Sequence, residues 1–338
     1  VFGAMQRCLD FNTTAIDADI VHAHTWYTHF GGILAKLNYS IPLVVTTHSL
    51  EPLRPWKREQ LTGGYDCSSW VEKTAIEMAD AVVAVSKETK NDILRFFKVD
   101  PARIHIIHNG IDLDEYRPTR APELLKPLGV DPAKPYILFV GRISRQKGIF
   151  HFIKALQYMD PDFQVVLCAG APDTPEIAYE MQERISAIQK KRNDIIWIKE
   201  MVDVPTKVAL YSQAAVFCCP SIYEPFGIIN LEAMACETAV VASAVGGIKE
   251  VVVDGETGLL VPAEQGESDS FELAAPEKFE RDFAQKVNSL MKDKDLREKM
   301  GKAGRIRAMD NFSWGAIAKK TCALYLSLIE KGGLCPEK

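Results

Sequence analysis

No run of apolar residues in this chain reaches the length of about 18–20 that a membrane-spanning helix needs. The eight cysteines include no C-x-x-C pair, so their spacing gives no sign of a cysteine-based metal site. Several cysteines lie in apolar runs, and we interpret them as reduced thiols of a cytoplasmic protein. The formal net charge is −5 and the basic residues are scattered, which gives no electrostatic reason to bind nucleic acid.

Two common nucleotide-binding signatures are also missing. The sequence contains no G-x-x-x-x-G-K-[ST] loop, which excludes a Walker-type phosphate site. No G-x-G-x-x-G follows a predicted strand, which argues against a dehydrogenase. There is also no short-period repeat that would indicate a solenoid.

The chain alternates β-branched runs with segments of helical spacing, which predicts an α/β protein. A length of 338 residues with 47% hydrophobic residues is enough for two cores. Residues 116–135 contain five prolines and are predicted to be the linker. We therefore predict a first Rossmann-like domain over 1–134, a second over 135–311, and a C-terminal helix over 312–338 that packs back on the first. The natural site is the cleft between two such units.

Two histidines follow predicted strands of the first domain. His24 ends the run 17–24 and His48 ends the run 41–49. Ligands of an open parallel sheet collect at the carboxyl ends of its strands, so both histidines are candidate site residues. For His24 a structural role is favoured over a functional one. For His48 the adjoining Thr-Thr-His-Ser run is hard to bury without a ligand or a polar network, which favours a functional role.

The remaining segments of the first domain are less specific. The loop 51–65 carries Arg54, Lys57 and Arg58, which could meet an anionic acceptor, although a solvated basic loop is the default interpretation. Ser86 ends another strand-like run and is predicted to cap the helix that begins near Lys87.

The most informative stretch is a turn flanked by two glutamates, Glu224 and Glu232. It follows a predicted buried strand at 214–219 and leads into a predicted helix over 230–236, with Asn230 as a plausible cap. Unpaired backbone N–H groups at such a helix start can receive a phosphate or a sugar hydroxyl. On one continuous helix the glutamates would lie ~12 Å apart, too far for a glycosidase pair. Because Pro225 and Gly227 interrupt the helix, this distance alone is not decisive.

A second loop carries two cations between glycines. The predicted strand 136–140 delivers Gly141, Arg142, Lys147 and Gly148 before a helix from Ile149. Cations in a glycine-bounded loop at a strand-to-helix junction are the arrangement expected for a diphosphate.

These motifs together resemble the retaining glycosyltransferases of family 4, which have the GT-B fold. The chain is most similar to the bacterial ADP-glucose-dependent glycogen synthases of the actinobacterial type. The similarity extends over essentially the whole chain and rests on the segments 21–26, 45–52, 109–112, 140–148, 224–232 and 246–250. A GT-B fold implies two Rossmann-like parallel-sheet domains that face each other across a cleft.

The resemblance also implies roles for single residues. Arg142 and Lys147 would hold the donor diphosphate, Glu224 would contact the donor sugar, and Glu232 the ribose. His48 would lie beside the transferred sugar, with His24, Arg54 and Lys57 on the acceptor side. The remaining donor contacts would come from Val202 at the base and from the backbone of Gly227, Ile228, Ile229 and Asn230. Protein cations would replace a metal ion, so neither a metal nor a separate cofactor is expected.

The resemblance predicts a retaining hexosyltransferase that moves glucose from ADP-glucose to the non-reducing end of an α-1,4-glucan, as in glycogen synthesis. The alternative within this class is transfer to glucose 1-phosphate, giving maltose 1-phosphate. The chain could also be another family 4 glycosyltransferase, or a non-catalytic nucleotide- or glucan-binding module. The motifs do not indicate the donor base, the acceptor or the oligomeric state.

The chain departs from the family pattern at its start. Family members begin with a strand and a glycine-rich loop that closes over the donor and acceptor, and neither precedes the first predicted strand here. We therefore expect an N-terminally incomplete chain that exposes apolar edge, binds ADP and shows no detectable transfer.

Overall fold

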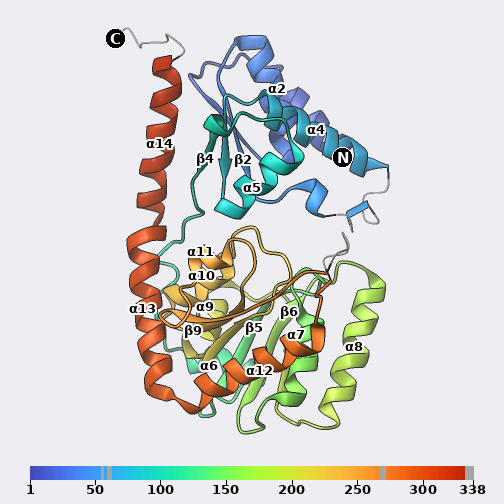
Figure 1. Ribbon diagram of the computed structural model, residues 1–338, viewed down its shortest axis with the longest axis vertical. Coiled ribbons are helices and arrows are strands. Elements are labelled where there is room, and N and C mark those ends of the chain that lie inside the picture. The colour runs from blue at the N-terminus through green and yellow to red at the C-terminus, as the bar shows by residue number, and fades with distance from the viewer. Residues whose placement is uncertain (55–56, 59–62, 267–271, 332–338) are drawn as a thin grey trace. The chain divides into compact units, whose positions relative to one another are not determined.

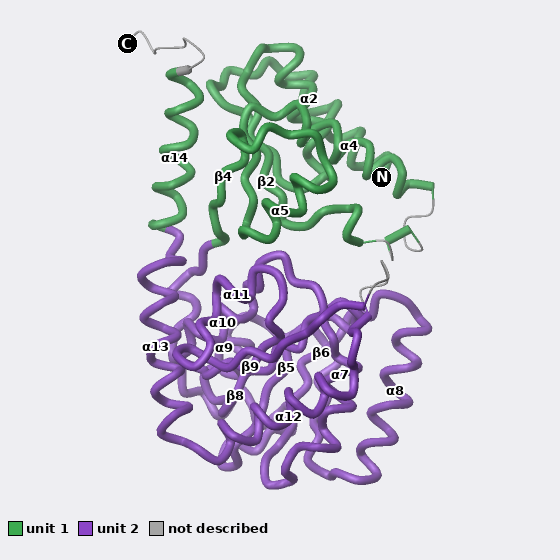
Figure 2. The backbone as a smooth tube through the Cα atoms, in the orientation of Figure 1, with its two compact units in different colours: residues 1–109, 315–338 green, residues 110–314 purple. Residues whose placement is uncertain are grey.

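The computed structural model describes residues 1–54, 57–58, 63–266 and 272–331. Figure 2 shows the chain divided into two compact units. Unit 1 comprises Val1–Asn109 and Gly315–Lys338, and unit 2 comprises Gly110–Trp314. The predicted boundary follows residue 134, but in the structure unit 2 begins at Gly110 and includes the whole proline-rich segment 116–135. There it forms helix α6 (Pro122–Leu125) and a 3₁₀ turn at Lys126–Leu128.

Unit 1 contains a four-stranded sheet in the order β1-β2-β3-β4. Its strands are β1 (Val21–His24), β2 (Leu43–Thr47), β3 (Ala81–Ala84) and β4 (Ile104–Ile106). All three pairings are parallel. The β2 and β3 residues are all buried, as expected for parallel strands covered on both faces. The carboxyl ends of β1 and β2 therefore lie next to each other.

The helices of this unit are α1 (Phe2–Phe11), α2 (Trp26–Tyr39), α4 (Gly64–Met78), α5 (Lys87–Phe96) and α14 (Trp314–Lys331), with 3₁₀ turns at Glu51–Leu53 and Pro101–Arg103. The last helix, α14, places Ile317 and Leu324 in one apolar cluster with Val44 and Val83 of the sheet. The C-terminal segment thus completes the core of unit 1.

Unit 2 contains a six-stranded parallel sheet in the order β10-β9-β8-β5-β6-β7. Its strands are β5 (Tyr136–Arg142), β6 (Gln164–Gly170), β7 (Ile195–Ile198), β8 (Val216–Cys219), β9 (Ala239–Ser243) and β10 (Gly258–Val261). The chain runs outward from β5 to β7, then returns to the other side of β5 and runs outward again from β8. This reversal between β5 and β8 is a topological switch point, where open α/β sheets bind their ligands.

The larger helices of unit 2 cover this sheet (Figure 1). They are α7 (Ile149–Ala155), α8 (Pro175–Gln189), α9 (Val204–Gln213), α10 (Ile228–Ala235), α11 (Ile248–Val251), α12 (Pro276–Lys292) and α13 (Lys294–Phe312), with a 3₁₀ turn at Leu156–Tyr158. Phe152 of α7 stacks on Phe139 of β5 and meets Phe283 of α12 edge to face. These rings are buried in the core of unit 2.

The predicted fold class, an α/β protein with two Rossmann-like parallel-sheet units, is confirmed. The predicted cap of α10 is wrong. The helix begins at Ile228, and its N-cap is Gly227 with a φ of 97°, a left-handed conformation that favours glycine. Asn230 lies inside the helix. Within the described parts of the chain, no helix is both long and apolar enough to cross a bilayer.

Gly148, in the loop after β5, closely approaches the backbone at the end of β8. Its φ is +65°, and an added Cβ would lie 1.8 Å from the carbonyl oxygen of Pro220. We expect Gly148→Ala to lower the free energy of unfolding by several kcal/mol, because backbone strain and a backbone clash add together (about 1–2 kcal/mol for the strain alone).

Gly129 is the matched control, because its φ is +81° and nothing lies within 4 Å of an added Cβ. Gly129→Ala should show the strain cost alone. Urea unfolding of both variants measures the difference, and equal destabilisation would contradict the close approach of Gly148 to Pro220.

Candidate active site

The loops that follow β5 and β8 meet at the switch point of unit 2. The two strands are direct neighbours, with Ile137 opposite Val216. The backbone N–H of Ile222 donates to the carbonyl oxygen of Gln146 (2.9 Å), and the Gln146 side chain donates to the carbonyl oxygen of Tyr223 (3.2 Å). The loop 141–148 and the turn 220–227, which are distant in sequence, therefore lie together at the carboxyl ends of β5 and β8.

Lys147 and Glu224 are joined across this junction. Lys147 Nζ lies 2.6 Å from Glu224 Oε2, and the two side chains are 17% and 10% exposed. The hydroxyl of Ser221 donates to the same carboxylate oxygen (3.3 Å). Burial lowers the pKa of Lys147, but the Glu224 charge and hydrogen bond outweigh it and raise that pKa above its ordinary value. Lys147 is therefore a cation at neutral pH, with a carboxylate as its partner.

The Glu224 backbone is fixed by the loop after β9. The N–H of Gly247 donates to the carbonyl oxygen of Glu224 (3.0 Å). Gly246 has a φ of +48°, and a Cβ there would lie 1.9 Å from the same oxygen. Only glycine allows this approach, so the Gly246–Gly247 pair sets the position of Glu224.

Arg142 ends β5 and has a carboxylate partner that the sequence analysis missed. Its guanidinium donates to Asp173 Oδ1, and the Asp173 side chain is nearly buried while that of Arg142 is half-exposed. The Asp173 N–H donates to the carbonyl oxygen of Ile143 (3.1 Å). Ala171, two residues earlier, has a left-handed φ of 47°. The only sequence signal was the position of Asp173 just after β6, the strand next to β5.

The residues predicted to contact the donor through their backbone, Gly227 to Asn230, lie at the start of α10. Ile228 is exposed and Asn230 is fully buried. Asn230 Nδ2 donates to the carbonyl oxygen of Gly227 (3.3 Å), so this side chain braces the turn from within the helix. The first N–H groups of a helix lack the usual i−4 partner, but the N–H of Asn230 already donates to the carbonyl oxygen of Gly227 (3.0 Å). Val202 lies separately, half-buried in the loop between β7 and α9.

Glu232, the second glutamate, lies one turn into α10 and accepts three hydrogen bonds. Its donors are Tyr116 Oη (3.0 Å), Lys207 Nζ (3.0 Å) and Tyr211 Oη (2.8 Å). The spacing of Glu232 gave no sign of these donors, because they come from α9 and from the segment after β4. The two glutamates therefore lie in different polar networks.

In unit 1 the predicted histidines come together. His24 Nδ1 lies 3.0 Å from His48 Nε2, and the rings are stacked. Burial, and then the neighbouring His24, lower the pKa of His48 to about 4. His22 joins the group by stacking on His24 and by hydrogen bonds to Tyr325 Oη (2.5 Å) and Thr46 Oγ1 (2.7 Å). At neutral pH this histidine cluster is uncharged and can offer hydrogen bonds to hydroxyl groups.

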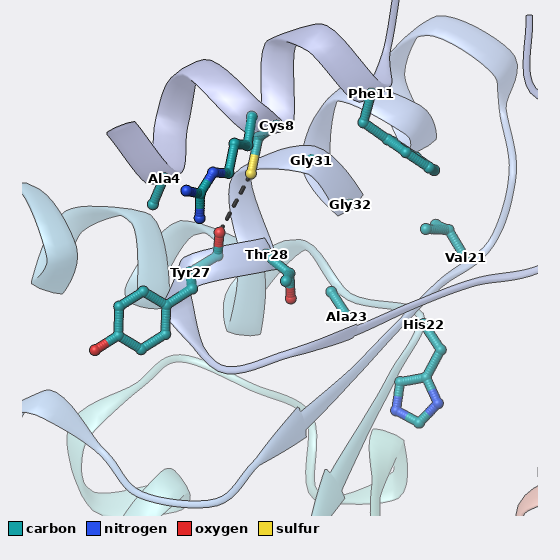
Figure 3. Close-up of a pocket in the computed structure, with 11 residues that line it drawn as sticks. Ala4, Cys8, Phe11, Val21, His22, Ala23, Tyr27, Thr28, Gly31 and Gly32 are labelled. Atoms are coloured by element: carbon teal, nitrogen blue, oxygen red, sulfur yellow. Dashed lines mark hydrogen bonds between the residues drawn. The ribbon is translucent and has the colours of Figure 1, made fainter. Parts of the chain in front are cut away.

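A cavity of about 490 Å³ lies beside β1 (Figure 3). It is lined by residues of α1, β1 and α2, which are mostly apolar, and Cys8 Sγ donates to the carbonyl oxygen of Tyr27 across one side (3.3 Å). His22 borders the cavity, whereas His24 and His48 are not among its lining residues. The predicted site residues thus lie outside this cavity.

The default interpretation of the basic loop as solvated is wrong for Lys57. Lys57 Nζ lies 3.0 Å from Glu51 Oε1, and these side chains are 8% and 1% exposed. Glu72 accepts from the N–H of Glu51 (2.8 Å), and burial raises the pKa of Glu72 to about 8. Arg54 is more accessible and donates to Ser49 Oγ (3.1 Å). Residues 55–56 and 59–62 of this loop lie outside the described residues.

No group of three histidine, cysteine, aspartate or glutamate side chains among the described residues is arranged to hold a metal ion. The polar groups that gather at the unit 2 site are instead a lysine, an arginine, carboxylates and backbone N–H groups. Such a set can stabilise a diphosphate and orient sugar hydroxyls.

Comparisons with known proteins agree with this chemistry. Residues 121–307 match the family described as "Glycosyl transferases group 1", and residues 3–115 match "Glycosyltransferase Family 4". A sucrose-phosphate synthase of Thermosynechococcus elongatus has a similar structure, with a TM-score of 0.73 and 28% identity, covering 93% of this chain and 74% of that one.

Two curated relatives correct the expected substrate. The α-maltose-1-phosphate synthase of Mycolicibacterium smegmatis is 49% identical over 321 residues, covering 94% of this chain and 81% of the relative. The enzyme of the same name from Mycobacterium tuberculosis is 48% identical over 312 residues, covering 91% and 79%. The expectation of a glycogen synthase is therefore wrong, because relatives at this identity carry another activity. The chain belongs to the group 1 glycosyltransferases, with the GT-B fold, and is a glycosyltransferase enzyme.

Proposed function

We propose that the protein transfers a glucosyl group from ADP-glucose to glucose 1-phosphate and forms α-maltose 1-phosphate with retention of configuration. The assignment of the donor-binding site is supported by one observation: Arg142, Lys147 and Glu224 all lie at the switch point of unit 2. The acceptor side is supported by the two relatives that are named α-maltose-1-phosphate synthases.

In this reaction the bond between C1 of glucose and the diphosphate oxygen breaks, and a bond from C1 to the acceptor hydroxyl oxygen forms. The acceptor proton passes to the leaving diphosphate. Negative charge therefore grows on the diphosphate in the transition state. Two cations in a partly buried site stabilise that charge without reorganising, which is an efficient form of electrostatic catalysis.

Before the donor binds, each of the two cations is stabilised by a carboxylate partner. A buried ammonium ion without a partner is costly, and Glu224 offsets that cost for Lys147. When the donor binds, its diphosphate compensates part of the Lys147 charge, and Glu224 becomes available to accept hydrogen bonds from the sugar hydroxyls. In unit 1, His48 and His24 are neutral at physiological pH and can offer hydrogen bonds to sugar hydroxyl groups.

In a version of the protein completed with the family's opening strand and glycine-rich loop, Glu224→Gln should lower turnover by about 100-fold or more, because the glutamine cannot supply a charged hydrogen-bond acceptor to the sugar. ADP should bind at least as tightly as in the wild type, since Lys147 loses its competing carboxylate. Turnover and ADP affinity are measured on one preparation. Glu183→Gln on the exposed surface of α8 is the control and should change neither. Wild-type turnover in Glu224→Gln would contradict the assignment.

Arg142→Ala with Lys147→Ala should abolish ADP binding, because each charged hydrogen bond to a phosphate contributes about 1.5–3 kcal/mol. Arg145→Ala is a matched control from the same loop. Arg145 is 69% exposed at its side chain and pairs with Glu180 of α8 (3.0 Å), so its loss should change ADP affinity less than about twofold. Calorimetric titration distinguishes the two, and equal effects of the double variant and the control would contradict a specific diphosphate site.

Arg54→Gln should weaken the use of glucose 1-phosphate more than the use of a neutral glucan, since only the former brings a phosphate. Lys57→Met should instead lower stability by about 3 kcal/mol, because it leaves buried Glu51 with only the more distant Arg54 (3.9 Å) and the Ser68 hydroxyl (2.9 Å) as partners among the described residues. Transfer kinetics with both acceptors and urea unfolding separate these effects. An equal loss with both acceptors in Arg54→Gln would show that Arg54 does not recognise the phosphate.

A further inference from the structure

The histidines of this protein are concentrated in unit 1, which contains six of the seven, whereas unit 2 contains His151. Helix α2 adds a buried histidine, His29, to the cluster of His22, His24 and His48. We propose that these four histidines form a pH-sensitive switch, which holds β1, β2, α2 and α14 together while the rings are neutral and releases them when the rings take up protons. This inference concerns the stability of unit 1 and does not depend on the proposed function.

The contact between His24 and His48 requires a neutral ring. His24 Nδ1 lies 3.0 Å from His48 Nε2, so one nitrogen must donate a proton and the other must accept it. Burial lowers the pKa of His48, and a hydrogen bond to the Asn109 side chain partly opposes that shift, which means that His48 donates in this bond. A neutral ring carries one N–H, so His48 Nε2 accepts from His24. If both rings were protonated, two N–H groups would face each other and the contact would break.

His29 has no group that could stabilise a charge on its ring. The residue is 1% exposed, and neither ring nitrogen has a hydrogen-bond partner within the described structure. Burial, followed by the charges of His24 and His48, lowers the pKa of His29 to about 3. A protonated ring at this position would be a buried charge without a partner, which is strongly destabilising.

His22 connects the cluster to the C-terminal helix. Its ring forms hydrogen bonds to Tyr325 Oη of α14 (2.5 Å) and to Thr46 Oγ1 of β2 (2.7 Å). Unit 1 is built from two separate chain segments, and the bond from His22 to Tyr325 joins them. The ring of His24 lies between those of His22 and His48, with centroid distances of 4.3 and 5.3 Å. Protonation of these rings would place like charges next to each other, and their repulsion would separate the elements that carry them.

The groups around the cluster do not offset such charges. They are the hydroxyls of Tyr325 and Thr46, the side chain of Asn109, and Arg7 and Cys8 of α1, which line the cavity that His22 borders. Arg7 would add a positive charge, and burial raises the pKa of Cys8, so its thiol stays neutral. Among the described residues, no carboxylate shifts the pKa of any of the four rings. The cluster is therefore stable only in its neutral form.

The direction of the pH dependence follows from the four pKa values. Each is lower in the folded protein than the ordinary histidine value of 6.5, and those of His22 and His48 fall to about 4. Below about pH 6.5 the unfolded chain therefore binds more protons than the folded one, so the free energy of unfolding decreases as the pH falls toward 4. If about three protons are taken up on unfolding, each pH unit changes the unfolding equilibrium constant by about 1000-fold.

The test follows unfolding of the full chain from about pH 7 down to about pH 5, where the expected uptake is about three protons. Urea unfolding at each pH gives the number of protons taken up. Hydrogen–deuterium exchange at each pH shows which segments lose protection. We expect β1, α2 and α14 of unit 1 to lose protection at a higher pH than β5 and β8 of unit 2.

Two variants each remove one ring of the switch. In His24→Gln the new amide can still donate to His48 but cannot take up a proton, and His29→Leu removes a buried ring whose nitrogens have no partner among the described residues. Each should reduce the proton uptake by about one and move the acid midpoint to lower pH. His105→Gln is the matched control. His105 lies on β4, at the opposite edge of the same sheet from β1, and its replacement should change neither quantity.

An uptake of less than about one proton at pH 5 would overturn the proposal, and so would loss of protection in both units at the same pH. An unchanged acid midpoint in His24→Gln would contradict the role of the contact between His24 and His48. Should His29→Leu fail to fold, Tyr325→Phe provides a second test. This variant should lose protection in α14 at a higher pH than the wild type, and equal pH values would show that His22 does not hold the helix.

Discussion

The Lys147–Glu224 ion pair joins the two loops on which the candidate active site of this glycosyltransferase depends. It spans the junction between β5 and β8, where the strand order of unit 2 reverses. The close approach of Gly148 to Pro220 and of Gly246 to Glu224 holds the same loops from the backbone. A charged pair in a partly buried place is stable only if its geometry is tightly supported, and these glycines supply that support.

A cation next to a carboxylate recurs three times in this site. Arg142 has Asp173, Lys147 has Glu224, and Lys207 has Glu232. Each pair holds a cation and a carboxylate in fixed positions relative to one another. These ion pairs also compete with a ligand, because a ligand binds only if its own hydrogen bonds match or exceed those that it replaces.

The sequence predicted what depends on local pattern and topology, and missed what depends on distant partners. β-branched runs predicted both parallel sheets, and Ser86 caps α5 as its position before Lys87 indicated. Asn230 was misassigned because polar residues near a helix start look alike, whereas the left-handed φ of Gly227 decides the start. The partner of Arg142 could not be read from its own loop, because Asp173 follows another strand. The acceptor was also misjudged, because the motifs surround the diphosphate, and enzymes with different acceptors share those motifs.

The most direct measurement is a crystal structure of the protein with ADP-glucose bound. The account predicts that Lys147 Nζ lies within hydrogen-bond distance of the diphosphate, that Glu224 accepts from a hydroxyl of the glucosyl group, and that Glu232 accepts from the ribose. A complex in which the Lys147–Glu224 pair is unchanged and the diphosphate lies away from the β5–β8 junction would contradict it.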